Sequence, residues 1–118
     1  MSTLRVNTLQ DATGSNQPAM VGAAKAWVNF DGTGTVAIRE SFNVSSITDT
    51  GVGNYTVNFT TAMPDANYAI FLSIRRTTDW GEQGTAQGSS YTTNFLFAVR
   101  DEVGTAYDTD AAYAVVFR

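Results

Sequence analysis

The acidic residues are the part of this sequence whose type and spacing could support chemistry, and they include two close pairs. Asp101 is followed directly by Glu102, and Asp108 is separated from Asp110 by one residue. Two carboxyl groups can hydrolyse a glycosidic bond, and alternating aspartates can bind Ca²⁺. The EF-hand pattern is absent, however, and aspartates in loops usually accept hydrogen bonds from nearby backbone N–H groups. We therefore expect turn capping at these positions, with a Ca²⁺ site and a glycosidase site as alternatives.

Histidine and cysteine are both missing from the chain. Their absence removes the usual general base, the commonest metal ligand and the thiolate nucleophile. A serine or threonine hydroxyl needs an adjacent base before it can attack a substrate, and no histidine can act as that base. The net charge of -4 argues against nucleic acid, because phosphate binding needs a clustered basic surface. We predict a protein that is not an enzyme, needs no cofactor or metal, and binds no nucleic acid.

Aromatic residues beside acidic and amide groups occur in two regions that we expect to be loops, residues 77–90 and 101–110. A flat apolar ring flanked by hydrogen-bonding groups is what a sugar-binding surface needs. The candidate receptor-binding residues on this argument are Asp79, Trp80, Glu82, Gln83, Tyr107 and Asp108. The alternative for Trp80 is that it closes the core or a seam between subunits, because tryptophan is highly buried on average.

The elements that position these candidate residues are expected to be strands, because the composition favours them. The 118 residues suit one domain and include 17 Thr, 11 Val and 14 aromatic residues, against 4 Leu and a single Lys. β-Branched and aromatic side chains fit a pleated, half-buried surface, whereas Leu and Lys are favoured by helices. No apolar run approaches the ~20 residues of a membrane span, so we expect no membrane insertion.

Apolar and polar residues alternate along most of the chain after residue 22, which is typical of half-buried strands. The even-numbered residues of 24–30 share one face, and Tyr55, Val57 and Phe59 are expected to face inward. Glycine-bearing turns at residues 31–34 and 49–54 join neighbouring strands into hairpins. The most apolar run, residues 68–77, predicts a central strand covered on both sides, and residues 36–44 predict one continuous apolar row. The sequence therefore predicts an all-β fold: an antiparallel β-sandwich of about seven strands over residues 22–118.

Residues 1–21 differ from the rest of the chain. Residues 4–9 alternate like a short strand but have no hairpin partner, and a polar stretch of turn formers follows them. We expect an N-terminal arm for attachment or oligomerisation, with Leu4, Val6 and Leu9 as the candidate attachment residues; a frayed terminus is the alternative. The strands also carry few protective charges, which favours edges or faces covered by other subunits.

Several segments resemble the tip module of tailed-bacteriophage fibres and related virion proteins. They are residues 24–39, residues 41–49, residues 53–60 and residues 63–68. Residues 2–11 are similar to the short segment that precedes such modules in many phage proteins. The resemblance covers residues 2–75, while residues 77–118 agree with it in strand pattern alone.

This resemblance implies a trimeric β-sandwich knob whose variable loops contact the host surface, with residues 77–90 and 101–110 in the variable stretch. The implied function is a short tail fibre or fibre-tip protein in the virion, which recognises a host-surface glycan or protein and contacts other phage virion proteins. The chain departs from the family in being almost all knob, with little shaft. The alternative is a capsid decoration protein that stabilises the shell on the capsid surface without binding a receptor.

Overall fold

The computed structural model describes residues 2, 3, 5, 23–75, 83–86 and 90–118, and it describes residues 83–86 by their backbone. The described chain contains strands and turns and no helix. Its strands are β1 (Ala24–Asp31), β2 (Ala37–Phe42), β3 (Val44–Gly51), β4 (Asn54–Phe59), β5 (Ala69–Arg75), β6 (Gln83–Ala86), β7 (Asn94–Arg100) and β8 (Ala111–Phe117).

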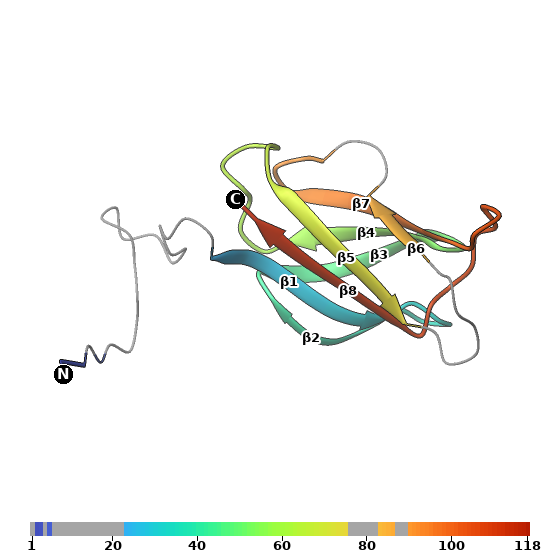
Figure 1. Cartoon of the computed structure of the whole chain (residues 1–118), viewed down its shortest axis with the longest axis horizontal. Coiled ribbons are helices and arrows are strands. Elements are labelled where there is room, and N and C mark those ends of the chain that lie inside the picture. Colours follow the sequence, from blue (N-terminus) through green and yellow to red (C-terminus); the bar gives the residue numbers. More distant parts are fainter. Residues whose placement is uncertain (1, 4, 6–22, 76–82, 87–89) are drawn as a thin grey trace.

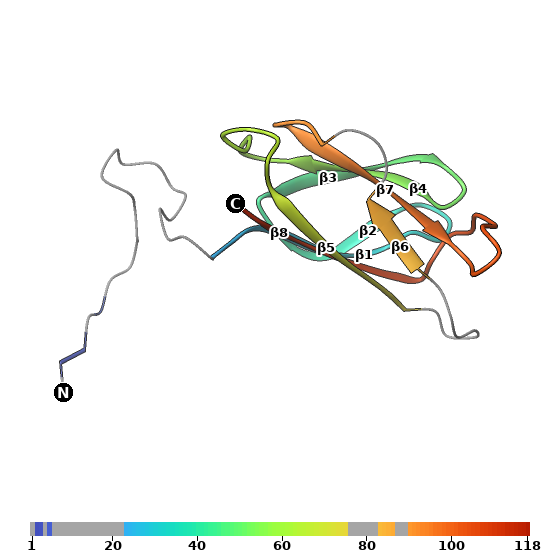
Figure 2. The same cartoon turned by 45° about the horizontal axis from the view of Figure 1, so that its top comes forward.

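These strands form two antiparallel sheets that pack face to face (Figures 1 and 2). Sheet A has the strand order β2-β1-β8-β5, and sheet B has the order β3-β4-β7-β6. The chain thus enters sheet A, moves to sheet B for two strands, returns for β5, visits sheet B again and closes with β8 in the middle of sheet A. The prediction of an all-β antiparallel sandwich is confirmed.

The core lies between the sheets and is rich in aromatic rings. Phe30 of sheet A contacts Tyr55 and Phe97 of sheet B, with ring centroids 5.3 and 5.6 Å apart, and the latter two rings are 5.4 Å apart. All three side chains are at most 2% exposed. Aromatic pairs at such separations stabilise a core beyond their buried area, by about 0.5–1.5 kcal/mol each. The inward-facing rows predicted for β1 and β4 are the rows that supply this core.

Both predicted hairpins are present, and aspartate side chains close their turns. Asp31 Oδ1 accepts a hydrogen bond from the Thr33 N–H at 2.9 Å, and Asp49 Oδ1 accepts one from the Gly51 N–H at 3.0 Å. Gly34 follows with φ of 58°, a conformation that glycine adopts at little cost. The hairpins β1–β2 and β3–β4 therefore form through turn residues that the sequence already displays.

Asn43 carries the chain from sheet A into sheet B between β2 and β3. Its φ of 54° is positive, which asparagine tolerates better than most residues. The side-chain Nδ2 donates to the carbonyl oxygens of Lys25 and Thr61, each at 3.1 Å, and Oδ1 accepts from the Thr61 N–H at 2.7 Å. One side chain thus ties both sheets together where the chain crosses.

The prediction of a central strand at residues 68–77 is wrong. The strand is β5, which lies at the edge of sheet A, and its outward residues are exposed, with Phe71 64% exposed. The inward residues Ile70, Leu72 and Ile74 do pack against the core. The run is apolar on both faces because its outer face continues an apolar surface of sheet A, which no described segment covers.

Two further expectations need correction. Residues 77–90 are not one continuous loop, because β6 lies within them and pairs with β7 from Gln83↔Arg100 to Ala86↔Phe97. The predicted single apolar row of residues 36–44 is also broken, since the register shifts where Ile38 pairs with Phe30 and Phe42 pairs with Trp27. A β-bulge turns the two halves of β2 to opposite faces, and a periodic pattern cannot reveal such an insertion.

Candidate functional site

The end of the sandwich opposite the start of β1 is the candidate functional site, and we call it the distal end. The turn between β1 and β2, the turn between β3 and β4, and residues 101–110 meet there, as Figures 1 and 2 both show. Binding residues are commonly carried on loops that a rigid scaffold positions. The distal end has this organisation, with three connections held above the two sheets.

Four residues, Gly32, Gly53, Tyr55 and Asp108, form a hydrogen-bonded cluster that we call the distal junction. The Tyr55 hydroxyl lies 3.0 Å from Asp108 Oδ1 and 3.1 Å from the carbonyl oxygen of Gly32. Asp108 Oδ1 also accepts from the Gly53 N–H at 2.9 Å. The carboxylate therefore joins the β3–β4 turn and β4 of sheet B to the segment that precedes β8, and the Tyr55 hydroxyl links this group to the β1–β2 turn of sheet A.

The environment of Tyr55 favours its neutral form. Burial raises the pKa of the Tyr55 phenol well above its usual range, and the hydrogen bond to the Asp108 carboxylate raises it further. A neutral phenol keeps the proton that it donates within the junction. The Tyr55 phenol is thus protonated throughout the neutral pH range and can donate its hydrogen bond there.

Gly53 lies where the backbones of three segments approach one another closely. Its φ is 65°, and a Cβ placed there would lie 2.7 Å from the carbonyl oxygens of both Val99 and Tyr107. Its own carbonyl oxygen accepts the Val99 N–H at 2.7 Å. Close approach of backbone to backbone requires a residue without a side chain. Three separate segments can meet at this point because position 53 is a glycine.

A cleft of about 280 Å³ opens beside the junction at the distal end of sheet B. Arg100 is its charged residue: Nη1 donates to the carbonyl oxygens of Gly53 at 3.2 Å and Val99 at 2.8 Å, and Nη2 donates to Asn54 Oδ1 at 2.8 Å. A guanidinium carries five N–H donors. These bonds use three of them, and within the described residues the Nε–H and the second Nη2–H have no partner. The residues lining the cleft are Thr50, Asn54, Tyr55, Leu96, Phe97 and Arg100.

The cleft combines hydroxyl, amide and guanidinium groups with one apolar wall. Leu96 is 37% exposed and alternates with the buried Phe95 and Phe97, so it lies on the outer face of β7. Thr50 is exposed on the opposite side of the cleft. Such a set of groups can hold a hydroxyl-bearing ligand by hydrogen bonds and by contact with its apolar surface. The arrangement suits recognition and supplies no general base or activated nucleophile.

The loop after β7 is shaped by Asp101. Its Oδ1 accepts hydrogen bonds from the Val103 N–H at 3.0 Å and the Thr105 N–H at 2.7 Å, and Gly104 adopts φ of 89°. The turn-capping expectation for Asp101 is confirmed. The loop presents Val103, which is 81% exposed, to solvent.

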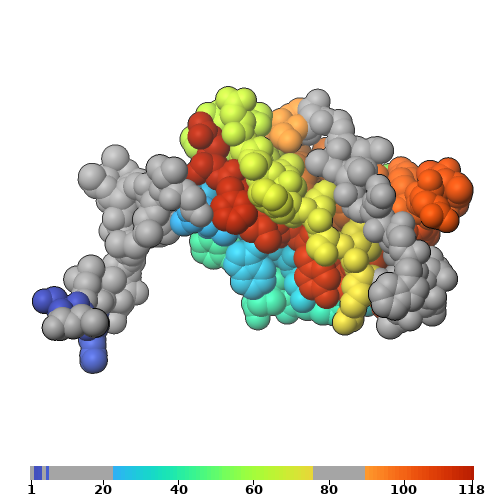
Figure 3. All heavy atoms as spheres, viewed as in Figure 1, coloured from blue at the N-terminus to red at the C-terminus, as the bar shows by residue number. Residues whose placement is uncertain are grey.

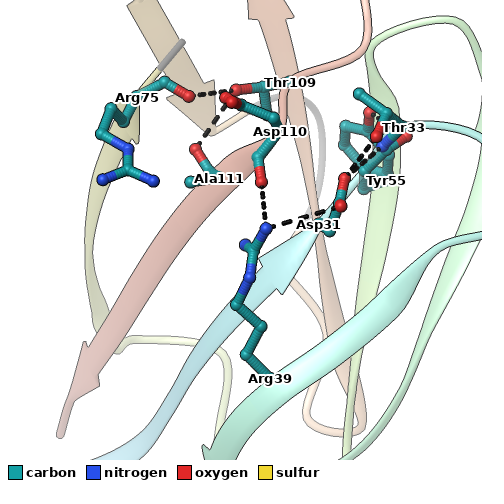
Figure 4. Close-up of polar contacts among 9 residues, drawn as sticks. Asp31, Thr33, Arg39, Tyr55, Arg75, Thr109, Asp110 and Ala111 are labelled. Carbon is teal, nitrogen blue, oxygen red and sulfur yellow. Dashed lines mark hydrogen bonds and ion pairs between the residues drawn. The ribbon is translucent and has the colours of Figure 1, made fainter. Parts of the chain in front are cut away.

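A polar network on the sheet A side of the distal end fixes the neighbouring turn (Figure 4). Arg39 donates from Nη2 to the carbonyl oxygen of Asp110 at 2.7 Å and lies 3.5 Å from Asp31 Oδ2. The Thr33 hydroxyl hydrogen bond to Asp31 is the main cause that lowers the pKa of that carboxyl, with the Arg39 charge as a smaller one. The fully buried Thr109 donates to the carbonyl oxygens of Arg75 and Ala111, and so joins the ends of β5 and β8.

Two of the predicted receptor-binding residues have their polar groups used by the fold. Asp108 accepts its hydrogen bonds within the distal junction, and the Tyr107 ring packs against the core while its hydroxyl donates to the Arg100 carbonyl oxygen at 3.2 Å. Gln83 begins β6 and pairs with Arg100 through the backbone.

The other candidate residues lie outside the described residues: Asp79, Trp80 and Glu82 of the receptor set, and Leu4, Val6 and Leu9 of the arm. Sequence reasoning missed the cleft residues Thr50, Asn54 and Arg100. The alternation along β7 could have predicted Arg100, since it places this residue on the same outward face as Leu96.

No group of three or more acidic residues that could hold a metal ion lies within the described ranges. Within the same ranges there is also no helix long and apolar enough to cross a membrane. Asp101 caps its own loop, whereas the expectation of turn capping is wrong for Asp108, whose Oδ1 accepts from the Gly53 N–H in the distant β3–β4 turn.

Comparison of the chain with protein-family models, with curated proteins and with solved structures finds no match. The fold and the geometry of the distal end therefore provide the basis for a functional proposal.

Proposed function

We propose that this chain is a bacteriophage virion protein, a short tail fibre or fibre tip, that attaches the particle to a host-surface glycan or protein. Its role is binding and not catalysis. The resemblance of residues 2–75 to fibre-tip modules supports this function, and so does the sandwich architecture. In this proposal the protein acts as a homo-oligomer, a trimer, whose N-terminal arm of residues 1–21 contacts other virion proteins.

The observation that carries the proposal is the arrangement of the distal end. An exposed loop and a polar cleft lie at the end of the sandwich farthest from the start of β1, and the distal junction holds both in place. A chain anchored through its N-terminus would present this end to a host cell. Rigid presentation reduces the ordering entropy that a receptor contact would otherwise cost.

Within this proposal the cleft contacts a glycan. The remaining N–H groups of Arg100 donate to hydroxyl or carboxylate oxygens of a sugar, and the Asn54 amide and Thr50 hydroxyl add further polar contacts. Leu96 provides an apolar surface for the sugar ring. The candidates Asp79, Trp80, Glu82 and Gln83 belong to this proposal as further receptor contacts.

The test is binding of the purified protein to cells on which the phage plates, together with its ability to block phage adsorption. Leu96→Glu in the cleft and Trp80→Ala should each weaken cell binding at least tenfold while the melting temperature changes little. Thr60→Ala is the matched control, because Thr60 is exposed just after β4 at the opposite end of the sandwich. Equal binding by all three variants would contradict the proposed site.

Capsid decoration is the competing function, and the same experiment separates it from attachment. Folded protein that neither binds host cells nor blocks adsorption would favour decoration. Antibody labelling of intact particles gives an independent answer, because attachment requires label at the tail and decoration requires label over the capsid.

A further inference from the structure

Four large apolar residues form a straight row across the outer face of sheet A. Phe42 of β2 pairs with Trp27 of β1, Trp27 pairs with Val115 of β8, and Val115 pairs with Phe71 of β5. Side chains of directly paired residues lie on the same face of a sheet, a few ångströms apart. We call Phe42, Trp27, Val115 and Phe71 the apolar row.

The apolar row is open to solvent in the described chain. Phe71 is 64% exposed, Phe42 is 42% exposed and Trp27 is 36% exposed. The Phe117 ring extends the surface, since it contacts Phe71 edge to face with centroids 5.8 Å apart. Figure 3 views this face, and β5, β8, β1 and β2 lie uncovered across its centre.

The fold does not need this row, because the core between the sheets is already closed by other residues. Scattered exposed apolar residues are normal, but a contiguous row of large apolar residues across a sheet face marks an interaction surface. Tryptophan and phenylalanine are also enriched at protein interfaces. The outer face of sheet A therefore has the properties of a contact surface.

Charges of opposite sign lie at the two edges of this face. Glu40 is exposed on β2, and Arg75 is exposed on β5, at the other side of the sheet. The neighbouring Arg39 lies 3.5 Å from Asp31, so these two charges largely offset each other. The remaining charge at the β2 edge is the negative charge of Glu40. The two edges are thus complementary to each other: each carries a phenylalanine, and the β2 edge is acidic where the β5 edge is basic.

We infer that the apolar row is the surface on which a second copy of this chain docks, with the β2 edge of one copy against the β5 edge of the other. Phe42 then contacts Phe71 of the neighbouring copy, and Glu40 faces the neighbouring Arg75. This inference rests on the proposed homo-oligomer and names its interface. A head-to-tail contact of this kind closes into a ring if its rotation permits.

The size of the face sets the expected strength. Four strands spaced about 4.8 Å apart and about seven residues long give a face of roughly 19 by 23 Å. A contact between the two edges covers at most this flat area of about 400 Å², which is smaller than the ~800 Å² per partner of a standard stable interface. We therefore expect association that dilution can reverse, so that its dissociation constant can be measured.

The first experiment measures the mass of the full chain by light scattering and sedimentation over a range of concentrations. We expect the wild type to give a multiple of the 12.7 kDa chain mass and to dissociate on dilution. Phe71→Ser should raise the dissociation constant at least tenfold. Val103→Ser is the matched control, since it removes an exposed apolar residue from the distal loop, and it should leave association unchanged.

The second experiment exchanges the charges. Glu40→Arg alone and Arg75→Glu alone should each weaken association, and the double variant should restore it, because the pair is then reversed. Both residues are exposed, so the variants should fold, and circular dichroism checks this. In a Trp80→Phe background, the emission of Trp27 should shift to shorter wavelength as the copies associate.

The outcomes distinguish the two proposals. A wild type that stays monomeric at all concentrations would overturn the homo-oligomer and the interface together. A wild-type oligomer that survives Phe71→Ser, or a double charge variant that is weaker than both single variants, would overturn the interface alone. In the second case the homo-oligomer stands and another surface must form it.

Discussion

The distal junction and the apolar row differ in how the fold uses their side chains. In the junction, Asp108 Oδ1 accepts hydrogen bonds from the Tyr55 hydroxyl and the Gly53 N–H, and Tyr55 is 1% exposed. In the apolar row, large side chains such as Phe71 lie on a sheet surface that the rest of the described chain leaves uncovered. The polar groups of the distal junction contact one another within the fold, whereas the side chains of the apolar row remain available to contact a partner.

This difference shows that residue type alone is a poor guide to which residues bind partners. Asp108 looks like a ligand-binding residue because it is charged and lies in a loop, yet its carboxylate joins three segments of the fold. Phe42 and Phe71 look like core residues because they are apolar and lie in strands, yet they face outward. Residue type therefore says less about function here than the contacts that the fold makes.

If the comparison is correct, substitutions in the junction lower stability, and substitutions in the apolar row change association and not stability. The largest effect is expected for Gly53→Ala, because the new Cβ meets two carbonyl oxygens and the positive φ is strained. We expect a loss of about 2–4 kcal/mol in the free energy of unfolding. Urea denaturation measures it, with Gly34→Ala as the control, since Gly34 has a similar φ but open space around its Cβ position. Equal losses for the two variants would contradict the role given to the backbone contacts.

The second effect concerns the phenol of the junction. Tyr55→Phe removes a buried hydroxyl from Asp108 and Gly32 and should cost about 1–2 kcal/mol in the free energy of unfolding. The pKa of Tyr55 is raised in the folded state, whereas it is about 10 in the unfolded chain. The unfolded chain therefore releases this proton first, and wild-type stability should decline as the pH rises above about 10.

Alkaline denaturation tests whether wild-type stability declines in this way as the pH rises. The decline should be shallower for Tyr55→Phe, which has no phenol to titrate at this position. Burial also raises the pKa of Tyr68, so part of the decline persists in the variant. Identical pH profiles for wild type and variant would mean that the phenol does not stabilise the junction.

A smaller effect is expected at an ion pair that belongs to neither region. Arg118 donates from Nε to Asp65 Oδ1 at 2.8 Å and from Nη2 to Oδ2 at 2.6 Å, and this hydrogen bonding lowers the pKa of Asp65. Its contribution is present above the unfolded pKa of about 3.9 and is lost as the pH falls through the lowered value.

Asp65→Asn should therefore show a smaller fall in melting temperature between pH 5 and pH 2, a window about one unit above and two below that pKa. Asp65→Asn should destabilise the protein less than Tyr55→Phe does, since exposed ion pairs contribute little to the free energy of unfolding. Thermal unfolding at several pH values measures it. A variant that loses more stability in acid than the wild type would contradict the assignment.

The smallest effect on stability is expected within the apolar row. Phe42→Thr should change the free energy of unfolding of the dilute, monomeric chain by no more than about 0.5 kcal/mol, because the side chain is outside the core and threonine suits a strand. Association at high concentration should weaken in the same variant. A loss of more than about 2 kcal/mol in the monomer would show that the row belongs to the folded core and would break the comparison.

Local sequence features predicted the β-sandwich well. Period-2 alternation identified the inward faces of β1 and β4, and the glycines and aspartates at residues 31–34 and 49–54 identified the hairpin turns. Alternation and turn chemistry act within a few neighbouring residues, so the sequence displays them directly. The sequence did not predict β6, because Gln-Gly-Thr-Ala has no alternation of apolar and polar residues. This strand forms by backbone pairing with β7.

The sequence by itself determined the fold class, the inward faces and the absence of histidine and cysteine chemistry. The tertiary structure decided which strand lies at an edge, where the bulge in β2 reverses its faces, and which aspartate becomes internal. It also created the apolar row, whose members are residues 27, 42, 71 and 115. Strand order and register depend on pairing between segments far apart in the chain, and no local pattern records which segments will pair.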